Sequence, residues 1–402
     1  MGVKIIIGLL VILGISMIGA RKSFVRMRLP FLTQYLFLTG TEFILIGLFL
    51  GSNFLNILDE KTLSSLGPFL SLVLGWIGFL FGVQVEFRKL RMFPPSYWMG
   101  TVIQSMVTMA LVFSVFYWLF WRMVPGEPAF VLAACVVLSA AAGVTAQSVP
   151  ALVAEEMRAP RVGIVRLVRY ISSLDGLVGL GIFGLLFCYI PPVPSGETGL
   201  FILLRGLAVS VGLGLIVGFL FNSFMFHKAS NEELLLIVIG MVTFSGGIAA
   251  YLHLAPLFVC MVMGILVVNL SPARERVMET LVGAEKPVYL ILLVLAGATW
   301  RVGGAEVFLL AGVYWSARLV GKMLGGYLAI RNLAAFPCPR TVGVTLVSQG
   351  GVAVAMVLGF QRAYPSDVTD TVVAIVLLAV MVNELISPYL ARRVFDRYCE
   401  ET

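Results

Sequence analysis

The residue with the clearest chemical implication is Asp175, which stands in the apolar segment SSLDGLVGL. Ser172 precedes it by three residues and lies on nearly the same face if this segment is helical. An ionisable side chain within a long apolar helix is costly, and such side chains commonly bind ions or relay protons. A single carboxylate holds either a proton or a small cation at any one time. We therefore expect Asp175 to be a shared site for a proton and a monovalent metal cation, with Ser172 beside it.

Two other apolar segments are interrupted by small and polar residues, at 142–148 and at 348–351. An interrupted helix frees backbone carbonyls for a cation and points the dipoles of its two halves at the interior. Paired interruptions in two halves of a chain also indicate inverted repeats, although small residues alone can serve close packing. The residues expected to support the ion site are Thr145, Gln147 and Ser148 at the first break, and Gln349, Gly350 and Gly351 at the second.

Two basic residues, Arg318 and Lys322, lie deep in another apolar segment and share a helix face because they are four residues apart. Their charges need partners, and Asp175, Glu384 and Glu42 are the acids placed deepest in apolar segments. Two interpretations remain open at this point. The basic pair takes part in ion movement, or it forms a structural salt bridge that holds the helix in place.

The composition excludes most classes of protein. Of the 402 residues, 60% are hydrophobic and only 12% are charged, and apolar runs recur from end to end. This indicates an all-α polytopic membrane protein with about 13 transmembrane helices and two broken helices. The net charge of +7 is explained by basic loops on one side of a membrane, so no nucleic-acid partner is expected. The five cysteines stand singly, and two histidines without metal-binding spacing argue against an enzyme or a cofactor.

The orientation follows from the loops. Lys and Arg gather in alternate loops, which places the N-terminus outside and the C-terminus in the cytoplasm. An odd number of spans is required for that result, in agreement with the predicted number.

The order of several motifs resembles the monovalent cation/proton antiporter superfamily, in particular its second branch of bacterial sodium/proton antiporters and potassium-efflux relatives. The resemblance covers nearly the whole chain. The motifs that carry it are GTEFILIGLFLGSNFLNIL, GPFLSLVLGWIGFLFGVQVEFRKL, VTAQSVPALVAEE, SSLDGLVGL, SARLVGKMLGGYLA and SQGGVAVAMVLGF.

This resemblance implies a sodium/proton antiporter-like fold of 13 helices in a homodimer, in a prokaryotic cell (inner) membrane. Residues 1–96 would form scaffold and dimerisation helices, and residues 97–190 a first set of core helices. Residues 191–230 would form a linker helix and residues 231–300 the remaining scaffold. Residues 301–402 would supply the last core helices and a short cytoplasmic tail. The core would move as an elevator and expose Asp175 to each side in turn.

Three positions depart from the family pattern. Leu174 occupies the place where electrogenic members carry a second acid, so the simplest cycle exchanges one cation for one proton and is electroneutral. The family's usual lysine falls at Arg318, which does not release its proton at accessible pH, with Lys322 one turn further on. Val352 replaces an acid after the second break, so the choice among Na⁺, Li⁺ and K⁺ is left open.

Two other functions remain as alternatives to antiport. One is a sodium-coupled symporter of organic anions on a related fold, which would need an organic-substrate cavity and more than one cation site. The other is a transport-inactive sensor or partner subunit that keeps the fold without ion coupling, an idea favoured by Leu174 and Arg318. A channel is disfavoured because the sequence lacks a filter-like motif or a ring of charge.

Overall fold

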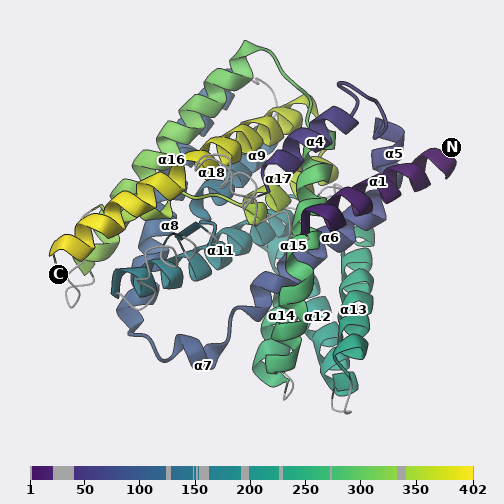
Figure 1. Ribbon diagram of the computed structural model, residues 1–402, viewed down its shortest axis with the longest axis horizontal. Helices are drawn as coiled ribbons and strands as arrows, with labels where there is room; N and C mark the ends of the chain where they lie inside the picture. The colour runs from purple at the N-terminus through teal and green to yellow at the C-terminus, as the bar shows by residue number, and fades with distance from the viewer. Residues whose placement is uncertain are drawn as a thin grey trace.

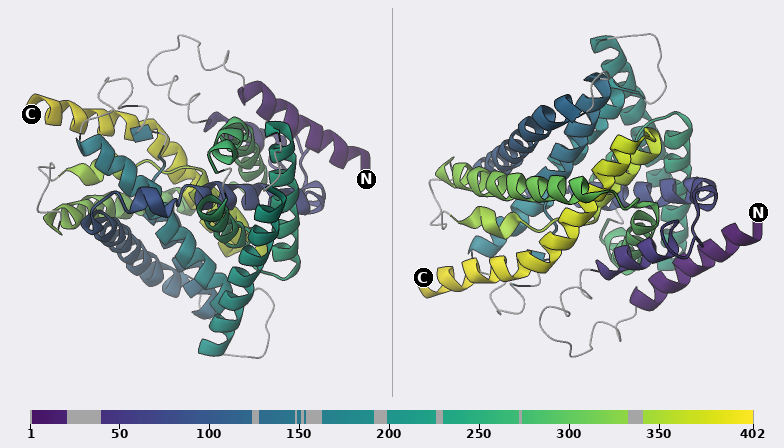
Figure 2. Two further views of the ribbon diagram at one scale, coloured as in Figure 1. Left: turned by 90° about the horizontal axis from the view of Figure 1, so that it is seen from below. Right: turned by 90° about the horizontal axis from the view of Figure 1, so that it is seen from above.

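The computed structural model describes residues 2–20, 40–123, 128–147, 149–150, 153, 163–191, 199–225, 230–271, 274–332 and 341–401. Within these ranges the chain is built from helices, with one isolated bridge between Gly51 and Leu58 and no longer strand pairing. Figures 1 and 2 show the helices gathered into one bundle with the two termini at opposite sides.

The helices form two groups, each defined here by the helices that pack together. The first group comprises α1 (Gly2–Ala20), α4 (Glu42–Leu50), α5 (Glu60–Ser65), α6 (Gly67–Val83), α13 (Asn231–Tyr251), α14 (Pro256–Leu270) and α15 (Arg274–Thr299). The second comprises α8 (Pro95–Met123), α9 (Pro128–Gly143), α11 (Gly163–Tyr189), α16 (Ala305–Asn332), the 3-10 helix η1 (Val342–Leu346), α17 (Gly351–Ala363) and α18 (Asp367–Glu401). The short α7 (Phe87–Leu90) follows α6, and α12 (Leu200–Met225) packs against α11, α13 and α14.

Glycines let the helices of the first group approach closely. A β-carbon on Gly78 of α6 would lie 2.0 Å from the carbonyl oxygen of Leu257 on α14, and one on Gly82 would lie 2.1 Å from that of Met261. Helices in apolar surroundings associate through such small residues because the gain comes from backbone contact and not from excluding water. The sequence therefore fixes where α6 and α14 cross.

Six helices in the described part of the chain are long and apolar enough to cross a membrane, or seven if the bent pair within α15 is one span. These helices identify an integral membrane protein. The apolar helices of 10–17 residues, among them α6, α9, α14 and α17, are shorter than that criterion. Several of them end at a break or border segments outside the described ranges, and the number of 13 spans stays a prediction.

Two interrupted helices meet in the middle of the second group. The first helix, α9, ends at Gly143 and the chain continues without helical structure through Gln147. The second interruption follows η1, and α17 begins at Gly351. The two breaks pair, because the amide of Ala146 donates to the Ser348 carbonyl at 3.1 Å and the Ser348 hydroxyl donates to the Ala146 carbonyl at 2.9 Å.

Candidate functional site

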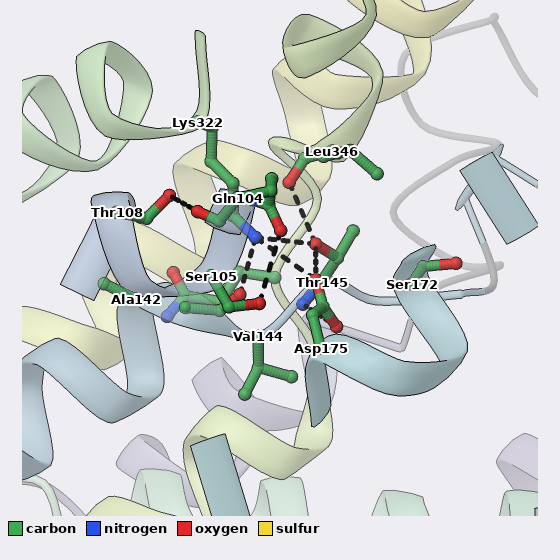
Figure 3. Close-up of polar contacts among 12 residues, drawn as sticks. Gln104, Ser105, Thr108, Ala142, Val144, Thr145, Ser172, Asp175, Lys322 and Leu346 are labelled. Carbon is green, nitrogen blue, oxygen red and sulfur yellow. Dashed lines mark hydrogen bonds and ion pairs between the residues drawn. The ribbon is translucent and has the colours of Figure 1, made fainter. Parts of the chain in front are cut away.

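Asp175 is fully buried on α11 and faces the first break. Its Oδ1 accepts a hydrogen bond from the backbone amide of Thr145 at 3.1 Å, and its Oδ2 accepts a short one from the Thr145 hydroxyl. The amide is available because α9 has ended and the chain is no longer helical. One residue of the break thus holds both carboxylate oxygens, as Figure 3 shows.

Lys322 of α16 supplies the charge that opposes Asp175. Its Nζ lies 3.2 Å from Oδ2 of Asp175 and donates to the Thr145 hydroxyl at 2.8 Å and the Gly143 carbonyl at 2.6 Å. Both members of this ion pair have no exposed side-chain surface. An ammonium group has three donors, and all three are engaged here. A cation that reaches Asp175 therefore competes with Lys322 for the same oxygen.

A polar stretch of α8 closes the site behind Lys322 (Figure 3). Gln104, Ser105 and Thr108 are all fully buried there, although α8 is otherwise an apolar helix. The helices α8 and α16 come close at Gly325, where a β-carbon would lie 2.6 Å from the Gln104 carbonyl oxygen. The sequence analysis did not single out these three residues, although their spacing along one face of an otherwise apolar helix is a signal that could have indicated this wall.

Arg318, one turn before Lys322, joins the two breaks to each other and does not pair with Asp175. Its guanidinium donates to four carbonyls, two from each break. The acceptors at the first break are Ala142 at 3.0 Å and Val144 at 2.8 Å, and those at the second are Ser348 at 3.1 Å and Val347 through a short bond. A planar guanidinium can span several acceptors in this way. Arg318 thereby neutralises carbonyl dipoles that a broken helix leaves unpaired.

Gln349 supports the second break from inside. Its amide nitrogen donates to the Ala141 carbonyl at 2.9 Å and to the Tyr314 hydroxyl at 3.0 Å. Its Oε1 accepts from Nδ2 of Asn383 on α18 at 3.0 Å. Gln349 is therefore a connector between α9, α16 and α18, and its described contacts do not include Asp175.

A cavity of about 430 Å³ separates the two helix groups beside the breaks. One wall comes from the end of α6 and the middle of α15, including Phe81, Gln84 and Tyr289. The facing wall is formed by residues 144–147 of the first break and by Gly350 and Gly351 of the second. Thr145 belongs to this wall and also binds Asp175, so the cavity approaches the buried carboxylate through a single residue.

The comparisons with known proteins give a structural match without a sequence match. No family model matches the chain, and no curated protein is significantly similar to it in sequence. Among solved structures, the chain resembles the sodium/proton antiporter MjNhaP1 from Methanocaldococcus jannaschii with a TM-score of 0.66 at 14% sequence identity. The match covers 98% of this chain and 99% of that one. The chain has a fold like that of a sodium/proton antiporter. At this identity the likeness establishes the fold, and the chemistry has to be argued from the residues.

In this antiporter-like fold, only some of the residues expected near Asp175 contact it. Thr145 and Lys322 do. Gln147 instead donates to Gln84, just after α6, at 2.7 Å, and Ser172 donates to the Arg169 carbonyl of its own helix at 3.2 Å. Ser148 lies outside the described residues.

Glu384 is buried on α18 beside Gly350 and makes no described ion pair. Gly350 and Gly351 line the cavity. The sequence predicted that the breaks free backbone carbonyls for a cation. In the structure the carbonyls of residues 142–144, 347 and 348 instead accept hydrogen bonds from Arg318 and Lys322.

Proposed function

We propose that the protein is a secondary active antiporter that exchanges a monovalent cation, Na⁺, Li⁺ or K⁺, for a proton, with Asp175 as the shared site. The observation that carries this proposal is the contact of a fully buried carboxylate with a break in a helix, next to a cavity. Coordination of a dehydrated cation requires oxygen atoms fixed in place. Asp175, the Thr145 hydroxyl and, once Lys322 moves away, the Gly143 carbonyl can provide them.

Exchange at this site follows from competition. When the cation is absent, Lys322 lies against Oδ2 of Asp175 and compensates its charge. A proton on the carboxylate removes the charge that attracts the cation, and a bound cation disfavours the proton. One carboxylate that alternates between the two forms gives one proton for one cation. The cycle we propose is therefore electroneutral, since Leu174 stands where a second acid could have added a charge.

The packing of two helix groups around one cavity suits movement of one group against the other. Asp175, Lys322 and both breaks all belong to the second group and bond to one another. The cavity separates them from α6 and α15 of the first group. We therefore place the core at residues 97–190 and 301–402, and the scaffold at 1–96 and 231–300 with residues 191–230 as linker. The core would carry its ion as an elevator.

The orientation, membrane and oligomeric state that we propose for the protein come from the sequence. Loop charge favours an N-terminus outside the cell and a C-terminus in the cytoplasm. The family resemblance supports a homodimer in a prokaryotic inner membrane.

The proposal is tested with purified protein in proteoliposomes that enclose a pH-sensitive dye. Addition of Na⁺, Li⁺ or K⁺ with the membrane potential clamped is expected to drive proton flux in the wild type and none in Asp175→Asn. Asp367→Asn is the matched control, because Asp367 is an exposed acid at the start of α18. Flux that persists in Asp175→Asn, or no flux with any cation in the wild type, would contradict the proposal.

A further inference from the structure

One face of α18 carries three buried oxygen atoms that have no hydrogen-bond partner in the described part of the chain. They are Oδ1 of Asn383, Oε2 of Glu384 and Oγ of Ser387. The three residues have relative exposures of 0, 2 and 1%. At about 100° per residue, these positions fall within roughly 100° of the helix circumference. Buried polar atoms are nearly always paired in proteins, so three unpaired oxygens within about one helical turn indicate a missing partner.

This face of α18 is directed at the second break. Nδ2 of Asn383 donates to Oε1 of Gln349, which fixes the direction of the asparagine side chain. A β-carbon on Gly350 would lie 3.9 Å from Oε1 of Glu384, and one on Gly351 would lie 2.3 Å from the ring of Tyr289. Gly350, Gly351 and Tyr289 also line the cavity between the helix groups. The Glu384 carboxylate is thus close to the wall of the cavity, and Asn383 and Ser387 share its face of α18.

No described basic group neutralises Glu384 by direct contact. Arg318 of α16 is the cation whose charge acts on it, but the Arg318 guanidinium already donates to four carbonyls of the breaks. From α15, Tyr289 is the other titratable group that interacts with Glu384. The site therefore combines one carboxylate with two neutral oxygens, and none of the three has a described donor.

We propose that Asn383, Glu384 and Ser387 bind a monovalent metal cation against the second break. Such an ion would satisfy all three oxygens and would match the single negative charge of the carboxylate. A proton on Glu384 supplies a single donor, which could pair one of the other two oxygens and not both. A divalent ion would place an uncompensated positive charge in an apolar interior next to Arg318. This site lies beyond the exchange assigned to Asp175 and does not depend on it.

The test is equilibrium binding of radioactive Na⁺ and Rb⁺ to the purified full-length chain in detergent, in alkaline buffer with choline as the replacement ion. Asp175→Asn removes the first site, and is expected to retain about one bound ion per chain. Adding Glu384→Gln to Asp175→Asn is expected to abolish that binding. Adding Ser387→Ala to Asp175→Asn removes only one oxygen, and is expected to weaken the binding of the remaining ion by about tenfold. The matched control is Glu42→Gln, because Glu42 is another acid with a buried unpaired oxygen.

The outcomes separate this proposal from the function of Asp175. Binding that survives Asp175→Asn and Glu42→Gln but is lost or weakened by the changes on α18 supports the second site, whether or not the wild type exchanges ions. If neither Na⁺ nor Rb⁺ binds to Asp175→Asn, the second site is ruled out, even if the wild type transports ions. Residual binding in Asp175→Asn that neither Glu384→Gln nor Ser387→Ala affects would also overturn it, and would indicate that water alone fills this place.

Discussion

At the scale of single residues, Lys322 is the charged group in contact with Asp175. Its three donors bind Asp175, Thr145 and the Gly143 carbonyl, so it compensates the charge of the ionised carboxylate where both side chains are fully buried. Desolvating a buried ion pair of this kind costs free energy, and removing only one of its two partners is strongly destabilising. We infer that Lys322 stabilises the deprotonated form of Asp175 until a cation binds.

Substitution of Lys322 by Met removes this charge with little change in volume. Asp175 then loses the cation that favours its ionised form and keeps its proton to higher pH. We expect the pH range of transport by Lys322→Met to move in the alkaline direction by about one to three units. The measurement is cation-driven proton flux across a series of buffers. Complete loss of exchange at every pH would contradict the account, because it would make Lys322 the proton carrier.

The sequence led to some of these residues and not to others. It predicted Asp175 and the first break because a carboxylate and polar residues in apolar helices are conspicuous. It did not decide between Arg318 and Lys322, since both lie on one helix face and differ by one turn. The structure places Lys322, and not Arg318, on Asp175. Gln147 and Ser172 have other partners because side-chain direction depends on tertiary packing.

At the scale of elements, Arg318 makes the two interrupted helices into one unit. It donates to Ala142 and Val144 in one break and to Val347 and Ser348 in the other. The breaks themselves were predictable from their glycines and polar residues. The sequence did not predict that the two breaks pair with each other, because contacts through backbone carbonyls do not depend on residue type. The proposed ion site thus depends on an arginine that makes no described bond to Asp175.

Substitution of Arg318 by Lys tests this role. A lysine cannot span four carbonyls, so at least two of them lose their donor, at about 1–3 kcal/mol each. We expect the melting temperature of the purified protein to fall by roughly 5 °C or more. Arg122→Lys is the control, because Arg122 stacks on Trp118 at the end of α8 and lies outside the breaks. An unchanged melting temperature in Arg318→Lys would show that the breaks do not need this link.

At the scale of the whole molecule, the two helix groups are also joined at the end opposite the cavity. The cavity lies at the end of α6, whereas Gly67 at its start accepts a short hydrogen bond from Arg362 of α17. Arg301, which follows α15, pairs with Asp370 of α18 at 3.1 Å and also with Glu60 of α5. These contacts join the groups at one end of the boundary, where they line a second pocket, while the first cavity lies at the other end. Movement of the core as an elevator would have to break them.

Removal of the Arg362 contact should therefore favour the state that opens at the other end. We expect Arg362→Ala to slow thiol labelling of Gln84→Cys, which lines the cavity, by several-fold in a background without native cysteines. Lys61→Ala is the matched control, since it removes a positive charge at the same end and no described bond between the groups. Equal labelling rates in Arg362→Ala and the parent would argue against this closure.

The proposed exchange requires that a proton and a cation compete for Asp175. The most direct measurement is the apparent KM for the cation in proteoliposomes as a function of pH. On the acid side of the titration of Asp175, each decrease of one pH unit leaves about one tenth as much carboxylate free. We predict that the apparent KM rises about tenfold per unit there, while the rate at saturating cation stays constant. An apparent KM that is independent of pH, with a maximal rate that falls instead, would place the proton and the cation at different sites.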